Sequence, residues 1–240
     1  MYRIASCSFG KDSLAMVLRL LEENLPLDEV VFFDTEMEFN AIYKTRDKIL
    51  PILQSKGIKY TELKPKQSFL YTMLEKPCSS KQKGFHYGYG WCGGLCRWGT
   101  TEKLKALDDY AESKNSIVYI GIASDETSRL IKPSKSYKVH PLNGWGMTEH
   151  DCLEYCYSKG YFWEENGIKL YDILDRGSCW CCCNKNRKEL KNIYQYLPEY
   201  WRKLKDLQSK LDRPMKKFSN KKHGNYGNVF AMEKVFQSEV

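Results

Sequence analysis

The sequence predicts an α/β fold in which helices cover both faces of a parallel sheet. Two observations support this: short apolar runs alternate with amphipathic helical patterns through the first half of the chain, and its 240 residues can bury the core of one such domain with an appendage. The predicted strands are residues 2–5, 29–33, 58–63 and 116–120, and the predicted helices between them are residues 12–24, 41–56 and 100–113.

The first strand and the first helix are joined by a polar turn, residues 8–13 (Ser-Phe-Gly-Lys-Asp-Ser). Backbone N–H groups at a helix N-terminus lack acceptors within the helix, and the helix dipole favours negative charge there. Gly10 permits close approach of the backbone, Lys11 adds a movable cation, and Ser8 and Ser13 add hydroxyl donors. The residues of this turn therefore predict a phosphate site, although a turn that only caps the helix would have a similar pattern.

Two further loops follow predicted strands and complete the expected site. Asp34 and Thr35 come directly after the second strand, and Gly121 follows the fourth. Ligands of such parallel sheets bind at the carboxyl ends of the strands, so the three loops are expected to converge on one pocket. For Asp34 the alternative is a helix cap or a turn cap.

The formal net charge of +8 points to a polyanionic partner such as a nucleotide or a nucleic acid. Much of the excess lies in residues 203–222, where eight basic residues are accompanied by two acidic ones. This segment is either a solvated basic tail or a surface that faces RNA or DNA. No apolar run approaches the ~20 residues needed to span a bilayer and no secretory signal precedes the first strand, so a cytoplasmic location without membrane contact is expected.

The rest of the chain contains an aromatic, cysteine-bearing loop and a helical region. Residues 76–99 are rich in glycine, aromatic residues and cysteine, which is typical of an ordered functional loop. Further helices, followed by a polar tail, are predicted from near Thr148, around residues 171–174, over residues 187–196 and over residues 198–211. The expected organisation is a domain of residues 1–185 with Cys-rich insertions and a basic helical extension of residues 186–240.

The ten cysteines are clustered rather than spread as in a disulfide framework. Cys92 and Cys96 form one group, and residues 179–183 (Cys-Trp-Cys-Cys-Cys) contain the Cys-x-x-Cys spacing, from Cys179 to Cys182, that is typical of zinc and iron–sulfur sites. The predicted ligands are the thiolates of Cys92, Cys96, Cys179 and Cys182, a donor set that suits either centre. The alternative is a group of buried structural thiols.

Four segments of the chain share their order and pattern with one known family. Residues 8–13 resemble the PP-loop of the N-type ATP pyrophosphatases, Ser-Gly-Gly-x-Asp-Ser, with Phe9 in place of the first glycine. Residues 30–35 resemble the strand and Asp-Thr step, residues 121–129 the Gly-Ile-x-x-x-Glu-x-x-Arg loop, and residues 92–103 the Cys/Trp-rich turn of the phosphoadenosine phosphosulfate (PAPS) reductase-like family. The resemblance covers residues 2 to about 183 and implies the Rossmann-like (HUP-type) sheet of the adenine nucleotide alpha hydrolase superfamily.

This resemblance implies an adenine-nucleotide site for ATP or a related nucleotide. The implied nucleotide-binding residues are Ser8, Phe9, Gly10, Lys11, Asp12, Ser13, Asp34, Thr35, Gly121 and Arg129. Lys11, Asp12 and Arg129 are implied to act in catalysis, Arg129 as a second cation on the phosphates. Mg²⁺ is an implied cofactor: Asp125 and Glu126 would hold it, or would only form an acidic surface turn.

The implied activity is adenylation, in which an acceptor oxygen attacks the α-phosphate of ATP and pyrophosphate leaves. Sulfonucleotide reductases of the family carry a C-terminal cysteine that takes up sulfite, whereas no cysteine follows Cys183 here. The expected function is therefore sulfur transfer to an acceptor such as tRNA or DNA, with a sulfur or electron donor protein and a cysteine-bound [4Fe–4S] cluster, or Zn²⁺ in its place. The alternatives are sulfonucleotide reduction through Cys181, Cys183 or a thiol of a partner, and a catalytically silent nucleic-acid-binding relative.

Overall fold

A computed structural model describes residues 1–81, 84–94 and 96–239. The chain forms two units: unit 1 consists of Met1–Lys64 and Glu102–Glu164, and unit 2 consists of Pro65–Thr101 and Glu165–Val240. The predicted loop of residues 76–99 belongs to unit 2, and its residues 82, 83 and 95 lie outside the described part of the chain. The domain boundary predicted after residue 185 stays a prediction.

The centre of unit 1 is a five-stranded parallel sheet with the strand order β3-β2-β1-β6-β7. Its strands are β1 (Tyr2–Ser6), β2 (Glu29–Phe33), β3 (Lys59–Leu63), β6 (Ser116–Ile120) and β7 (Lys138–Val139). The order reverses at β1, because β2 and β3 extend to one side of it and β6 and β7 to the other. All residues of β2 are buried, as expected of a strand covered on both faces. The predicted α/β fold is confirmed.

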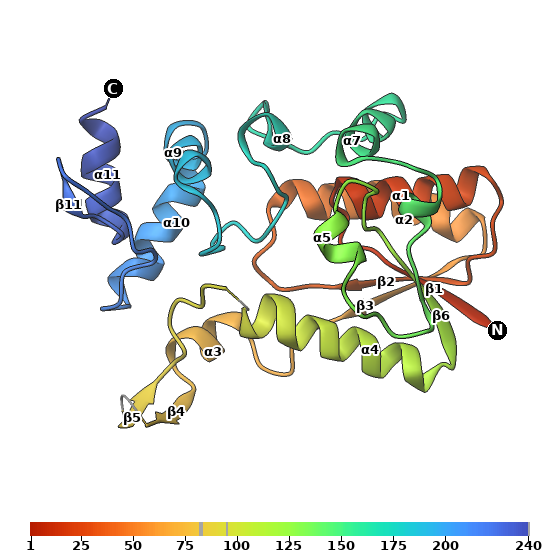
Figure 1. The fold of residues 1–240 in the computed structure, drawn as a ribbon, viewed down its shortest axis with the longest axis horizontal. Helices are drawn as coiled ribbons and strands as arrows, with labels where there is room; N and C mark the ends of the chain where they lie inside the picture. Colours follow the sequence, from red (N-terminus) through yellow and green to blue (C-terminus); the bar gives the residue numbers. More distant parts are fainter. Residues whose placement is uncertain (82–83, 95, 240) are drawn as a thin grey trace. The chain divides into compact units, whose positions relative to one another are not determined.

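Helices cover both faces of this sheet. They are α1 (Lys11–Glu22), α2 (Asn40–Ser55), α4 (Lys103–Ser113), α5 (Thr127–Leu130), α6 (Pro141–Gly144) and α7 (Glu149–Ser158). Figure 1 shows α1 and α2 on one face of the sheet and α4 on the other. The N-terminus of α7 is where Thr148 predicted it, since Thr148 and Asp151 form a reciprocal capping box.

Unit 2 combines short hairpins with helices. Its first segment holds α3 (Phe69–Leu74), β4 (Pro77–Ser80), β5 (Gly84–Tyr87) and a π-helical turn (Arg97–Glu102) that leads into α4. After β8 (Glu164–Glu165), its second segment holds β9 (Ile168–Lys169), α8 (Leu170–Ile173), α9 (Arg187–Tyr196), α10 (Pro198–Ser209), β10 (Ser219–Asn220), β11 (Gly224–Asn225) and α11 (Val229–Gln237). Within the described ranges, no helix is both long and apolar enough to cross a membrane.

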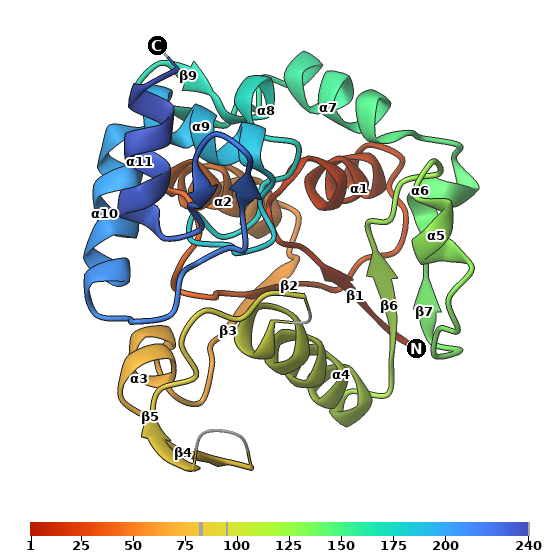
Figure 2. The same ribbon diagram turned by 60° about the vertical axis from the view of Figure 1, so that its left-hand side comes forward.

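The expectation that the chain ends in a polar tail is wrong. Val229, Met232 and Phe236 are buried on one face of α11, which packs against α9 and α10 (Figure 2). Their spacing of three and four residues is that of an amphipathic helix. Glu233 of α11 also forms an ion pair of 2.9 Å with Lys205 of α10. The basic region therefore leads into a packed C-terminal helix.

Candidate functional site

The polar turn of residues 8–13 lies at the carboxyl end of β1, where α1 begins. The loop after β6, the neighbour of β1, approaches the turn closely. A Cβ atom added to Gly121 would lie 2.8 Å from Ser13 Cα and 2.9 Å from Ser13 N, which is closer than real Cβ contacts come. Position 121 must therefore be glycine for the two loops to meet. They meet where the strand order reverses, which is where ligands bind in such sheets.

Phe9 shapes the turn through its backbone and its buried ring. Its φ of 56° lies in the left-handed region that glycine adopts without strain, and the PP-loop pattern has glycine here. The fully buried ring packs edge-to-face on Phe32, with 5.2 Å between the ring centroids, and Trp163 Nε1 donates to the Phe9 carbonyl oxygen at 2.7 Å. The Phe9 side chain therefore lies in the core, and only its backbone belongs to the surface of the turn.

Hydrogen bonds of the Ser8 and Ser13 hydroxyls stabilise the turn. Ser13 Oγ accepts from the Ser8 N–H at 3.1 Å, lies 3.1 Å from Ser8 Oγ, and donates to the Gly10 carbonyl oxygen at 3.2 Å. Gly10 is the N-cap of α1 and has no side chain with which to cap it. The first-turn N–H groups of α1 thus lack acceptors within the helix, as an anion site requires.

Lys11, the cation of the turn, is held between two carboxylates. Its Nζ lies 2.7 Å from Asp12 Oδ1 and 3.0 Å from Glu149 Oε1, and its side chain is only 8% exposed. Burial by itself lowers the pKa of Lys11, but the charges and hydrogen bonds of Asp12 and Glu149 raise that pKa above its ordinary value. Lys11 therefore keeps its positive charge despite its burial.

Three carboxylates meet beside Lys11. Oxygen atoms of Asp12, Glu126 and Glu149 lie within 4.8 Å of one another. Carboxylate oxygens are ligands that Mg²⁺ prefers, so the residues present fit the predicted cofactor. Glu126, one of the two predicted ligands, belongs to this group. The other, Asp125, accepts the Glu149 N–H at 3.0 Å with its carboxylate and so occupies the N-terminus of α7.

Sequence reasoning missed Glu149, which lies 138 residues from its partner Lys11. The signal that could have found it is Thr148, the predicted N-cap, because the residue after an N-cap is the first of its helix. Lys11 and Glu149 are the first residues of α1 and α7, and these two helices pack against each other. Their contact therefore brings two helix N-termini to one place.

Arg129, the predicted second cation, joins the same charged group. Its guanidinium nitrogen lies 2.7 and 2.8 Å from the two carboxylate oxygens of Glu126. The Arg129 side chain is 47% exposed, whereas that of Glu126 is 8% exposed. A buried carboxylate thus holds a cation that remains accessible from solvent.

The loop after β2 uses its polar groups locally. Asp34 Oδ1 accepts from the Glu36 N–H at 2.8 Å and from the Tyr43 hydroxyl at 2.7 Å, and Thr35 donates to Glu38 at 2.8 Å. Burial and the adjacent Asp34 raise the pKa of Tyr43, so its hydroxyl stays protonated. These contacts support the turn-cap interpretation of Asp34, and nucleotide binding by Asp34 and Thr35 stays a prediction.

In unit 2, one asparagine joins the two cysteine-bearing loops. Asn184 Oδ1 accepts from the Gly94 N–H at 2.8 Å, and Asn184 Nδ2 donates to the Gly94 carbonyl oxygen at 2.9 Å. Gly94 lies between Cys92 and Cys96, and Asn184 directly follows residues 179–183. This paired hydrogen bond brings together the two loops that the predicted ligand set requires.

The cysteines of the predicted set differ in exposure from the other six. The half-buried cysteines are Cys92, Cys96, Cys179 and Cys182, and the rest are buried. Burial raises the pKa of Cys183 to about 12 and raises that of Cys181 well above its ordinary value. The four predicted ligands are thus the more exposed cysteines of the chain. Among the described residues, no three cysteine sulfurs lie within 4.8 Å of one another, and the ligand set stays a prediction.

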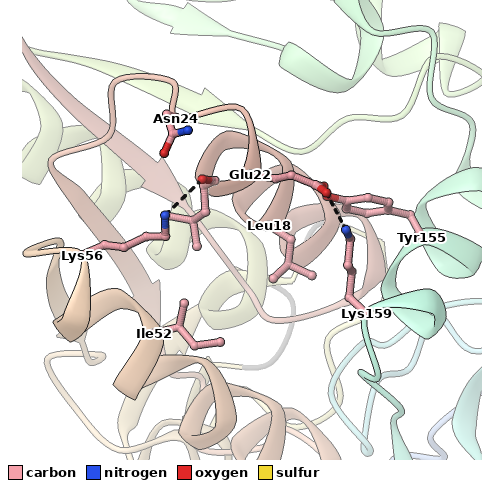
Figure 3. Close-up of a pocket in the computed structure, with 8 residues that line it drawn as sticks. Leu18, Glu22, Asn24, Ile52, Lys56, Tyr155 and Lys159 are labelled. Carbon is pink, nitrogen blue, oxygen red and sulfur yellow. Dashed lines mark hydrogen bonds and ion pairs between the residues drawn. The ribbon is translucent and has the colours of Figure 1, made fainter.

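A groove of about 330 Å³ lies elsewhere in unit 1 (Figure 3). The residues that line it are Leu18, Leu21, Glu22, Asn24, Ile52, Lys56, Tyr155 and Lys159. Glu22 pairs with Lys159 at 2.6 Å and accepts a hydrogen bond from the Tyr155 hydroxyl. The groove adjoins the C-terminal half of α1, whereas the polar turn precedes its N-terminus, so the groove is separate from the candidate site.

The sheet and its turn define the class, a doubly wound α/β domain with a polar turn at the point where the strand order reverses. Residues 3–161, more than half of the chain, match the family model of the phosphoadenosine phosphosulfate reductase domain. The chain belongs to this family.

Among solved structures, the chain is similar to the U34-tRNA thiolase NcsA from Methanococcus maripaludis with its [4Fe–4S] cluster. That likeness has 13% sequence identity and a TM-score of 0.48, and covers 99% of this chain and 72% of the thiolase. No curated protein matches the chain.

Proposed function

We propose that the protein is an ATP pyrophosphatase of the PP-loop type that adenylates an acceptor for sulfur transfer. The observation that carries this proposal is the charged group at the N-terminus of α1, where Lys11 lies among the carboxylates of Asp12, Glu126 and Glu149. Helix N–H groups and a cation suit the phosphates of ATP, and the carboxylates suit Mg²⁺. Membership of a phosphoadenosine phosphosulfate reductase domain family supports an adenine nucleotide as the ligand.

In the proposed reaction an acceptor oxygen attacks the α-phosphorus of ATP, the bond from that phosphorus to the bridging oxygen breaks, and pyrophosphate leaves. The first-turn N–H groups of α1 hold phosphate oxygens, and Lys11 and Arg129 neutralise the charge that develops on pyrophosphate. Both cations are held by carboxylates, Lys11 by Glu149 and Arg129 by Glu126, which positions them in advance. Mg²⁺ held by Asp12, Glu126 and Glu149 would supply further charge neutralisation at the phosphates.

The cysteine loops supply the second part of the proposal. Four thiolates suit a [4Fe–4S] cluster or Zn²⁺, and Cys92, Cys96, Cys179 and Cys182 would hold it. Such a centre would bind the sulfur that displaces adenosine monophosphate from the activated acceptor, with a donor protein as the source of sulfur. The net charge of +8 favours a nucleic acid, tRNA or DNA, as that acceptor.

The test is pyrophosphate release from ATP and Mg²⁺ in the presence of nucleic-acid acceptors. We expect Lys11→Ala and Glu149→Gln each to reduce the rate by roughly 10²-fold or more, because each removes a charge from the proposed phosphate and Mg²⁺ site. Lys44→Ala is the matched control, since Lys44 is an exposed lysine of α2. Pyrophosphate release that is absent, or that is as fast in Lys11→Ala as in the wild type, would contradict the proposal.

Family membership also favours a second candidate, reduction of a sulfonucleotide. That reaction needs a nucleophilic thiolate, for which the predicted sources are Cys181, Cys183 or a thiol of a partner. Both side chains are buried and their thiol pKa values are raised by burial, so neither is a ready nucleophile. Sulfite release from PAPS with thioredoxin, lost in Cys181→Ser or Cys183→Ser, would favour this candidate over adenylation.

A further inference from the structure

The β4–β5 hairpin of unit 2 presents two aromatic rings to solvent. Phe85 and Tyr87 are each 66% exposed, and their rings meet edge-to-face with 5.3 Å between centroids. They alternate along β5 and therefore share one face, where Ser79 and Pro77 are their partners on β4. Single exposed apolar side chains are ordinary, whereas a contacting pair of exposed rings on one strand face is a surface feature that indicates a ligand.

The opposite face of the hairpin is directed into unit 2. Cys78 and His86 are paired across the two strands, and Cys78 is 8% exposed. Beyond β5, Gly88 donates to the Lys76 carbonyl oxygen at 2.8 Å, and a Cβ atom at Gly88 would lie 2.2 Å from Met73 O, so the chain runs flush against α3. Backbone contacts thus hold the end of β5 against α3, which lowers the entropy lost when the rings bind a ligand.

The segment that carries Phe85 and Tyr87 also carries cations, two of which lie over the ring of the nearby Tyr89. The Arg97 guanidinium lies 4.3 Å from the centroid of the Tyr89 ring, and Lys76 Nζ lies 5.6 Å from it. Lys81, which directly follows β4, is exposed. Glu75 is the one acidic residue between Pro65 and Thr101 in the sequence. Exposed rings interleaved with lysine and arginine are the combination that binds unpaired bases and their phosphates.

We propose that the β4–β5 hairpin binds single-stranded nucleic acid, with unpaired bases stacked on Phe85 and Tyr87 and phosphates paired with Lys76, Lys81 and Arg97. Stacking needs a free π-face, which a base pair inside a duplex does not offer, so the surface selects unpaired segments. The excess of positive charge argues against an apolar protein partner, whose contact would leave those cations desolvated. This inference deepens the proposed function, on which it rests for its biological purpose, by naming the acceptor as a nucleic acid with unpaired bases.

The test is fluorescence anisotropy with a short unstructured RNA oligonucleotide, the same sequence as DNA, and the corresponding duplex, without ATP. We expect both single strands to bind more tightly than the duplex. Affinity for them should fall roughly tenfold for each ring removed in Phe85→Ala and Tyr87→Ala, and little in Phe85→Tyr or Tyr87→Phe, which keep a ring. Arg97→Ala should flatten the salt dependence of binding, because it removes a phosphate contact. Tyr196→Ala is the matched control, since Tyr196 is 47% exposed on α9, outside the hairpin.

Three results would overturn the inference: equal affinity for single strand and duplex, unchanged affinity after removal of both rings, or self-association of the wild type that the double variant loses. The last result would make the rings an interface between protein chains. Pyrophosphate release separates this inference from the proposed function. Loss of oligonucleotide binding in the ring variants should leave their binding of ATP and Mg²⁺ unchanged. A wild-type protein that binds single strands but releases no pyrophosphate from ATP with nucleic-acid acceptors would refute the adenylation proposal alone.

Discussion

Phe9 provides a direct test of how the polar turn is held. Its φ of 56° costs a residue with a Cβ atom roughly 1–2 kcal/mol relative to glycine. Glycine in turn loses roughly 0.5–1 kcal/mol through the greater freedom of its unfolded chain. We therefore expect Phe9→Gly to be more stable than Phe9→Ala by about 0.75 kcal/mol, the difference between the middles of these two ranges. Both variants should be less stable than the wild type by about 3–5 kcal/mol because the buried ring is lost.

The assay is urea unfolding followed by far-ultraviolet circular dichroism, with the free energy of unfolding compared across the three proteins. Phe33 supplies the matched pair, because it is equally buried but lies in β2 with extended backbone. There the order should invert, with Phe33→Ala more stable than Phe33→Gly by about 0.5–1 kcal/mol. If Phe9→Ala were more stable than Phe9→Gly by about 0.5–1 kcal/mol, as is expected at position 33, the left-handed backbone of Phe9 would carry no strain and the reasoning would be refuted.

Three more predictions concern Gly121, Cys7 and Asn184. Gly121→Ala should lower the free energy of unfolding by about 1–3 kcal/mol, because its Cβ would press on the backbone of Ser13, whereas Gly144→Ala, which faces open space, should change it little. Burial raises the pKa of Cys7 to about 11, so the stability that its protonated thiol contributes is complete below pH 9 and is lost as pH rises toward 11. Over that interval the free energy of urea unfolding should fall more steeply in the wild type than in Cys7→Ala, by up to about 1.4 kcal/mol per pH unit. Equal slopes in the two proteins would contradict this prediction. Asn184→Ala should reduce the affinity for iron or zinc after reconstitution roughly 10–100-fold. Asn184→Asp should have an intermediate affinity, because its carboxylate keeps an acceptor for the Gly94 N–H. Full metal retention in Asn184→Ala would show that the two cysteine-bearing loops meet without this side chain.

The sheet could be read from the sequence because its signals are local. Residues 29–33 and 116–120 are apolar runs bounded by polar turns, and the observed β2 and β6 have the predicted bounds. The start of α7 after Thr148 could also be predicted from a local signal, because the two residues of its capping box lie within one helical turn.

Other features depend on contacts that no local pattern encodes. The ion pair of Glu149 with Lys11 depends on how α7 packs on α1. The left-handed backbone of Phe9 is stabilised by Phe32 and Trp163, which lie far from it in the sequence. The buried face of α11 was visible in the spacing of its apolar residues, but the basic, glycine- and asparagine-containing stretch before it obscured that pattern.

The contact of Lys11 with Glu149 also bears on when the site comes into existence. The turn of residues 8–13 is synthesised well before α7, which supplies the third carboxylate of the group, Glu149. A nascent chain that ended before Glu149 would hold the turn, Asp12 and Glu126 and still lack a complete group of carboxylates. Because contacts between residues so distant in sequence form late in folding, the protein should acquire affinity for the proposed nucleotide only once α7 has packed against α1.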